Sequence, residues 1–202
     1  MTRSNARARN RQARSTARFA AVQALYQMDI AQTDLNAVIH EFETFRAEIG
    51  DEDSEPGEHA IAEADRTFFA EILRGVVRLQ ATIDPAVDRQ LARGWRLVRV
   101  DSILRQILRA ALFELIDRQD VPGRVVINEY IEIAKAFFDE EEPKVVNGVL
   151  DALAKQYRAP EFEGPRGERE TAARAAELPD VTGEPGSSSV QLDQAAPDKP
   201  EK

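Results

Sequence analysis

Basic side chains near the N-terminus carry the clearest chemical signal in the sequence. Four arginines recur at intervals of four, three and four residues, which places them on one face if the segment is helical: Arg7, Arg11, Arg14 and Arg18. Guanidinium groups at this spacing can meet successive phosphates, and each can also stack on an unpaired base. Tyr26, further along the same segment, could supply another stacking surface. The pattern favours single-stranded RNA as a ligand.

The distribution of charge agrees with this interpretation but leaves a plainer one open. The formal net charge of the chain is −9, yet residues 1–28 contain six arginines and no acidic residue. A basic segment on an acidic body suits a polyanionic ligand. A basic N-terminus can also simply keep a protein in solution, and Tyr26 can be part of a hydrophobic core. Charge alone does not decide between the two.

Enzymatic chemistry lacks the residues that it needs. The chain has no cysteine and two histidines, which excludes a thiol nucleophile, a cysteine-ligated zinc site and most imidazole chemistry. His40 and His59 have no third ligand at metal-binding spacing. The acidic run 139–142 lacks the ligand spacing of a calcium loop and is typical of acids that precede a helix. The sequence predicts a protein that is not an enzyme and needs neither a metal nor a cofactor.

The elements that must position the arginines are helices. Apolar residues between residues 15 and 158 follow a helical period almost throughout. Asp34 and Asp84 are expected as N-caps, with Pro85 at the first position of the helix that follows Asp84. About seven helices are expected, the first carrying Tyr26 and the others near 35–49, 68–79, 85–93, 100–116, 126–138 and 143–157. The pattern predicts an all-α protein of two joined helical bundles, with the acidic stretch 47–65 as a loop.

Composition divides the chain into three segments. Residues 1–13 are expected to form a basic, flexible arm, residues 14–158 an all-helical domain, and residues 159–202 a disordered tail. The tail is acidic and rich in proline and glycine, so it cannot bury enough apolar surface to offset the entropy cost of ordering. There is no run of about 18 apolar residues and no secretory signal, so the expected location is the cytoplasm.

Several short segments, in a fixed order over residues 14–157, carry a more specific signal. They are Arg14–Arg18, Ala21–Gln27, Val100–Arg105, Ala111–Leu115, Val126–Lys135 and Lys144–Asp151. Together they resemble the NusB family of bacterial transcription antitermination factors. One position differs, because Val145 stands where many members of the family have phenylalanine.

The resemblance implies an all-helical fold of two bundles and a non-enzymatic role. It also implies a partner, NusE, the small-subunit ribosomal protein that doubles as a transcription factor. With NusE, the chain would bind the single-stranded boxA element of nascent ribosomal RNA transcripts. The complex, together with other Nus factors, would help RNA polymerase pass terminators. Homodimers that hide the RNA-binding face are a further implication of the resemblance.

The resemblance also implies which residues contact RNA, because RNA contacts in the family involve the basic N-terminal region and the first helix. The candidates carried over by position are Arg14, Arg18 and Tyr26, with Lys135 and Lys144 near the last two helices as weaker choices. Arg7 and Arg11 rest on charge and spacing alone.

A second function stays open at this point. The N-terminal domain of a ribosomal RNA cytosine methyltransferase resembles NusB in fold, so the chain could be a stand-alone regulatory relative of that domain. The methyltransferase itself is excluded, since the chain has neither a cysteine nor a glycine-rich cofactor loop.

Overall fold

The computed structural model describes residues 3–48, 64–91 and 96–163 of the 202-residue chain. Every regular element within these ranges is helical. The elements are α1 (Arg3–Ala31), α2 (Leu35–Glu48), α4 (Arg66–Gln90), the 3-10 helix η1 (Leu97–Arg99), α5 (Ser102–Asp117), α6 (Gly123–Phe137), α7 (Glu141–Tyr157) and α8 (Ala159–Phe162). The predicted all-α fold with about seven helices is confirmed.

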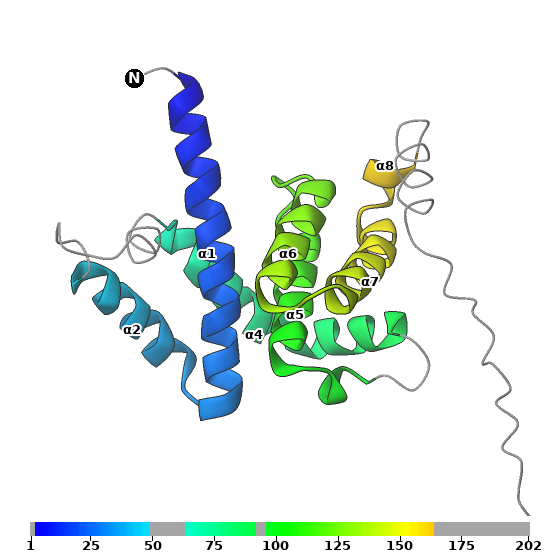
Figure 1. The fold of residues 1–202 in the computed structure, drawn as a ribbon, viewed down its shortest axis with the longest axis horizontal. Coiled ribbons are helices and arrows are strands. Elements are labelled where there is room, and N and C mark those ends of the chain that lie inside the picture. Colours follow the sequence, from blue (N-terminus) through cyan, green and yellow to red (C-terminus); the bar gives the residue numbers. More distant parts are fainter. Residues whose placement is uncertain (1–2, 49–63, 92–95, 164–202) are drawn as a thin grey trace, which may run out of the picture.

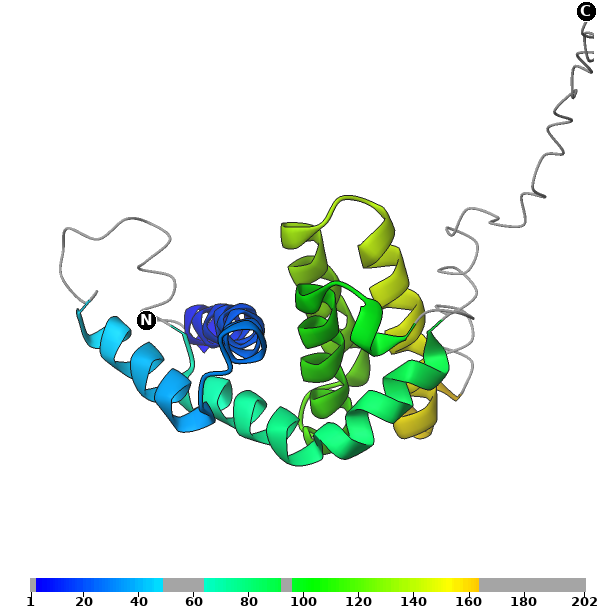
Figure 2. The same ribbon diagram turned by 90° about the horizontal axis from the view of Figure 1, so that it is seen from below.

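The helices form two groups that share the long helix α4 (Figures 1 and 2). Helices α1 and α2 pack against one part of α4, and α5 and α7 pack against it as well. Helices α5, α6 and α7 contact one another, and α1 also contacts α5 and α6. The prediction of two joined bundles is therefore confirmed, with α4 as the helix common to both.

The prediction of two separate helices at 68–79 and 85–93 is wrong, because α4 is one continuous helix over Arg66–Gln90. Asp84 is not an N-cap, because its carboxylate accepts hydrogen bonds from Nε and Nη2 of Arg109 at 2.8 and 2.7 Å. Pro85 lies inside α4 on an exposed position. The helix continues through the proline because Ile83 and Ala86, on either side, are both fully buried. Tertiary packing here outweighs the cost of a missing backbone hydrogen bond.

The start of α2 is as predicted, while that of α4 uses a different cap. Asp34 caps α2, since its carboxylate accepts a hydrogen bond from the Asn36 backbone N–H at 2.8 Å. Asp65 caps α4 by accepting one from the Phe68 backbone N–H at 3.0 Å. Most of the expected loop 47–65 lies outside the described residues.

Close approach of α4 and α5 explains a glycine within a helix. A Cβ atom added to Gly75 would lie 1.9 Å from an atom of the Phe113 ring, which is far inside van der Waals contact. Phe113 is itself buried at 1% exposure. Glycine costs a helix about 1 kcal/mol relative to alanine, and here it makes room for the aromatic ring that joins the two helices.

Both ends of the helical domain extend beyond the boundaries expected from composition. Helix α1 begins at Arg3, so residues 3–13 belong to a helix rather than to a flexible arm. Alanine and arginine are strong helix formers, and the packed C-terminal part of α1 supplies the nucleus from which the helix continues. At the other end, residues 159–162 form α8 and Phe162 is buried. The expected tail is thus ordered up to Glu163, and residues 164–202 lie outside the described residues.

Arg158 explains why the chain stays ordered past residue 158. Its buried guanidinium donates hydrogen bonds to three backbone carbonyl oxygens at the end of α5, those of Glu114, Leu115 and Arg118, at 3.1, 2.6 and 2.6 Å. It also donates to Glu161 Oε1 at 2.6 Å, while Glu161 Oε2 accepts from the Gly123 backbone N–H at 2.7 Å. The side chain satisfies carbonyls that a helix end leaves without partners and links α5, α6 and α8.

Candidate nucleic-acid interface

The N-terminal end of α1 extends past the neighbouring helices and carries the first two arginines of the predicted row (Figure 1). Arg7 and Arg11 are exposed. Within residues 3–48, 64–91 and 96–163, neither forms an ion pair. Among the described residues, no carboxylate therefore competes with an anionic ligand for these two guanidinium groups.

Arg14 lies where α1 meets the body of the protein, and its side chain is 33% exposed. Its Nε lies 3.7 Å from Asp65 Oδ2 and its Nη1 lies 3.7 Å from Asp120 Oδ2. Its guanidinium carbon is 5.2 Å from the centre of the Phe68 ring. The Nε has no hydrogen-bond partner among the described residues. Arg14 is thus near two carboxylates without being held closely by either.

Arg18 is buried, at 3% exposure, and its charge is matched inside the core. Its Nε and Nη2 donate to the two carboxylate oxygens of Glu114, both at 2.8 Å. The hydroxyl of Tyr130 donates to the same carboxylate at 2.8 Å, and Arg18 Nη1 lies 3.4 Å from Glu129. Burial alone would lower the pKa of Arg18, but the hydrogen bonds and charge of Glu114 outweigh it and raise the pKa above its ordinary value.

This burial corrects the prediction that Arg18 contacts RNA. A phosphate could reach the guanidinium only by displacing Glu114, which would leave a buried carboxylate without its cation. The sequence does contain a signal that a buried cation is needed here. Glu114 falls within the widest apolar stripe, between Phe113 and Leu115, and all three residues are buried. A carboxylate in such a position requires a buried donor, and spacing on α1 alone could not show that Arg18 supplies it.

Tyr26 is 37% exposed, so its side chain is not enclosed in the hydrophobic core. At 100° and 1.5 Å per residue, it lies about a quarter turn around the axis and about 28 Å along it from Arg7. Phe19, two helical turns earlier on the same side of α1, stacks on Phe137 with ring centres 5.1 Å apart. This contact places the end of α6 against the side of α1 that carries Tyr26.

The two candidate lysines lie on exposed or half-exposed positions and are paired with acids of their own helices. Lys135, near the end of α6, lies 2.8 Å from Glu132, and Lys144, in α7, lies 3.1 Å from Glu141. Exposed pairs of this kind contribute little to stability and can exchange partners at low cost. Lys135 is two residues from Phe137 in α6, so its side chain lies on nearly the opposite side of that helix from the contact with α1.

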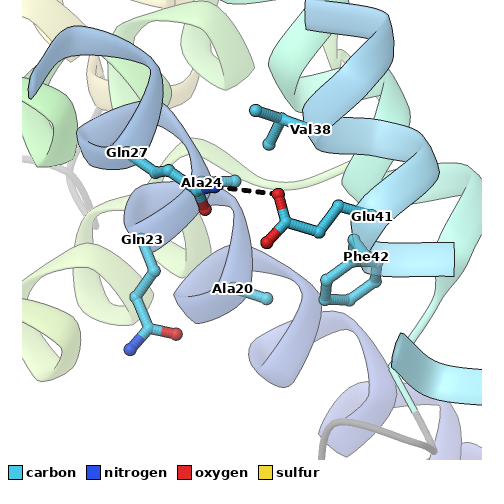
Figure 3. Close-up of a pocket in the computed structure, with 7 residues that line it drawn as sticks. All are labelled: Ala20, Gln23, Ala24, Gln27, Val38, Glu41 and Phe42. Carbon is cyan, nitrogen blue, oxygen red and sulfur yellow. Dashed lines mark hydrogen bonds between the residues drawn. The ribbon is translucent and has the colours of Figure 1, made fainter. Parts of the chain in front are cut away.

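A pocket of about 240 Å³ lies on another side of α1, between this helix and α2 (Figure 3). Gln23 and Gln27 line it from α1, and Glu41 and Phe42 line it from α2. Gln27 Nε2 donates to Glu41 at 2.9 Å across the opening. No basic side chain is among its lining residues, so the pocket is unsuited to a phosphate and separate from the arginine row.

The described part of the chain contains neither a candidate membrane span nor a candidate metal site. No helix there is long and apolar enough to cross a membrane. No group of three or more histidine, aspartate or glutamate side chains there is arranged to hold a metal ion.

Comparison with known proteins places these features in a family. Residues 15–155 match the NusB family. The transcription antitermination protein NusB of Allorhizobium ampelinum is 53% identical over 148 residues, covering 73% of this chain and 89% of that protein. The protein of the same name from Caulobacter vibrioides is 53% identical over 147 residues, covering 73% of this chain and 95% of that protein.

Solved structures agree with the sequence comparison. A structure of NusB from T. maritima has a TM-score of 0.57 and 31% sequence identity, and the match covers 77% of this chain and 97% of that one. A structure reported as that of a plectonemic RNA supercoil contains a chain with a TM-score of 0.55 and 25% identity, covering 71% and 94%. The family match spans residues 15–155 and so begins just after Arg14, and the chain belongs to the NusB family.

Proposed function

We propose that this protein binds the single-stranded boxA element of nascent ribosomal RNA together with NusE, and that the complex helps RNA polymerase pass terminators in the cytoplasm. The observation that carries the proposal is the free end of α1, where Arg7 and Arg11 are exposed on an otherwise acidic protein. Relatives with about half of their residues identical are named transcription antitermination proteins.

The proposed interface combines phosphate contacts with base stacking. Arg7, Arg11 and Arg14 would contact the RNA backbone, and the exposed ring of Tyr26 would stack on a base. Single-stranded RNA suits this surface because its bases are unpaired and can reach an aromatic ring beside the helix.

The charge balance explains why a partner is proposed. The chain as a whole carries −9, so the acidic remainder of the protein repels a polyanion that approaches the arginines. RNA binding by the isolated chain should therefore be weak. A second protein that contacts both the RNA and this chain would raise the affinity through a joint surface. NusE is proposed for this role from the family resemblance.

Fluorescence anisotropy with labelled boxA RNA tests the proposal. We expect weak binding to the chain alone, a marked gain with saturating NusE, and weaker binding of a strand with the same bases in scrambled order. Sedimentation velocity on the same samples would show whether a homodimer competes with RNA. Equal affinity for boxA and scrambled strands, with and without NusE, would contradict the proposal.

A further inference from the structure

Asp120 lies beside Arg14, the residue of the arginine row between the exposed Arg11 and the buried Arg18. Its side chain is 54% exposed and its Oδ2 is 3.7 Å from Arg14 Nη1. We propose that Asp120 limits the RNA affinity of the interface by opposing a phosphate at Arg14. This inference rests on the proposed function and adds a residue that lowers the affinity of the chain for RNA.

The hydrogen bonds around Asp120 show that Arg14 is not its main partner. Arg118 donates from Nε to Asp120 Oδ1 at 2.8 Å and from Nη2 to Oδ2 at 2.9 Å. Arg118 also contacts Glu71 and lies over the Phe68 ring, at 4.9 Å from its centre. Asp120 is thus held in place by a bidentate pair, while its contact with Arg14 is longer than a hydrogen bond.

Arg14 therefore keeps donor capacity that an incoming phosphate could use. A guanidinium presents five N–H donors, and the 33% exposed side chain of Arg14 approaches Asp65 and Asp120 no closer than 3.7 Å. Its Nε is buried, so a phosphate would bind at the terminal nitrogens. A phosphate that accepts hydrogen bonds from Arg14 would lie within a few ångströms of the Asp120 carboxylate. The arginine attracts the phosphate and the aspartate repels it from the same place.

Asp120 stays charged under all conditions in which RNA would bind. Hydrogen bonds from Arg118 lower the pKa of Asp120 from its ordinary value of 3.8 to about 2. The repulsion is therefore permanent rather than switched by pH. Two unit charges about 4 Å apart in water interact by an amount equivalent to roughly a fivefold change in affinity, and salt reduces this further.

Asp65, the second acid near Arg14, is a poor test of the idea. It caps α4 through the Phe68 backbone N–H, and its own N–H donates to the Ala13 carbonyl oxygen at 3.0 Å. Its substitution would remove the cap of α4, at the point where the backbone of residue 65 is bonded to α1. Asp120 makes its side-chain contacts in an exposed turn after α5 and can be replaced with less damage.

The test compares Asp120→Asn with two matched variants of the full chain, each measured with NusE and labelled boxA RNA at low salt. Asp117→Asn removes the same charge near the end of α5, where Asp117 pairs with Arg78 at 3.1 Å. Glu71→Gln removes the other acidic partner of Arg118. We expect Asp120→Asn to bind about three- to fivefold more tightly than the wild type, and both controls to change affinity by less than about twofold.

A second comparison ties the effect to Arg14. In the Arg14→Gln background, adding Asp120→Asn should give no comparable gain, because the cation opposed by Asp120 is absent. A gain that persists in this background, or a gain no larger than that of Asp117→Asn, would overturn the inference while leaving the proposed function intact. If Asp120→Asn lowers the thermal midpoint, Asp120→Ser provides a second variant for the same comparison. Absence of boxA binding by the wild type with NusE would overturn both proposals.

Discussion

The two ends of the arginine row on α1 have the same side chains and the same spacing but different surroundings. Arg7 and Arg11 lie on the part of α1 that extends past the other helices, and both are exposed. Arg18, on the same face, is buried and hydrogen-bonded to Glu114. The comparison teaches that helical spacing identifies a face, whereas residues on other helices decide whether that face binds a ligand or stabilises the core.

Arg14 lies between these two situations and shows where one changes into the other. It is partly exposed and near two acids, but it forms no close bidentate pair such as that of Arg18. The same helix therefore changes from exposed to buried arginines within about two turns. Variants at the two ends should separate RNA binding from stability.

The largest expected effect is at the buried end. Arg18→Gln should lower the free energy of unfolding by about 3–5 kcal/mol, because it leaves the Glu114 carboxylate buried without a cation. Arg11→Gln, the matched control on the exposed end, should change it by less than about 0.5 kcal/mol. Urea unfolding followed by circular dichroism measures both. Similar values for the two variants would remove the distinction between the ends of the row.

Arg158 is a second buried arginine, at the C-terminal end of the helical domain, and loss of its contacts with α8 should also cost stability. A chain that ends after Arg158 should lose about 2–4 kcal/mol of stability, because Phe162 no longer packs and Glu161 no longer binds Arg158 and Gly123. A chain that ends after Glu163 should be as stable as the full chain, since residues 164–202 contain few apolar side chains. Thermal and urea unfolding of the two truncations provide the measurement, and equal stabilities would contradict the role given to α8.

Tyr26 tests whether the exposed side of α1 contributes more than charge. Tyr26→Ala should weaken boxA binding in the presence of NusE by about 1–3 kcal/mol, because a stacked base loses its aromatic partner. The salt dependence of binding should stay constant, since stacking releases no counterions. Tyr26→Phe, which keeps the ring, should bind nearly as well as the wild type. A lower thermal midpoint with unchanged RNA affinity would show that the ring serves stability instead.

The smallest expected effect is on the stability of the protein at low pH, through the carboxylate of Asp120. The pKa of Asp120 is lowered to about 2 in the folded protein, from an ordinary value of 3.8. The ionised carboxylate therefore stabilises the folded state above about pH 4, and this contribution is lost as the pH falls toward 2. Asp120→Asn should show a smaller loss of stability than the wild type over this interval. Thermal midpoints at pH 5 and pH 2.5 measure the difference, and parallel losses would contradict it.

Much of the fold could be predicted because local signals and packing agree. The apolar period gave helices in nearly all of the right places, and Asp34 was correctly identified as a cap. The prediction failed at Pro85, where burial of Ile83 and Ala86 keeps one helix continuous. It also failed at Phe162, a single aromatic residue in a segment whose average composition resembles a tail. In both cases contacts distant in sequence decide the outcome.

The candidate site was less predictable than the fold, because contacts between residues distant in sequence decide which arginines are exposed. The row of arginines and its face were evident from spacing, and the exposure of Tyr26 supports its selection. The spacing could not separate Arg18 from Arg7, because the partner of Arg18 lies 96 residues later in the sequence. Asp120 gave no signal at all, since an aspartate in an exposed turn is ordinary until the fold places it beside Arg14.

The salt dependence of RNA binding tests most directly the claim that the exposed arginines form the interface. Single-strand binding loses affinity with salt at a log–log slope of about 0.7 for each phosphate neutralised. Arg7→Gln, Arg11→Gln and Arg14→Gln combined should therefore reduce the slope for boxA RNA with NusE by about 2, with the thermal midpoint nearly unchanged. A slope equal to that of the wild type would contradict the assignment of α1 as the phosphate-binding element.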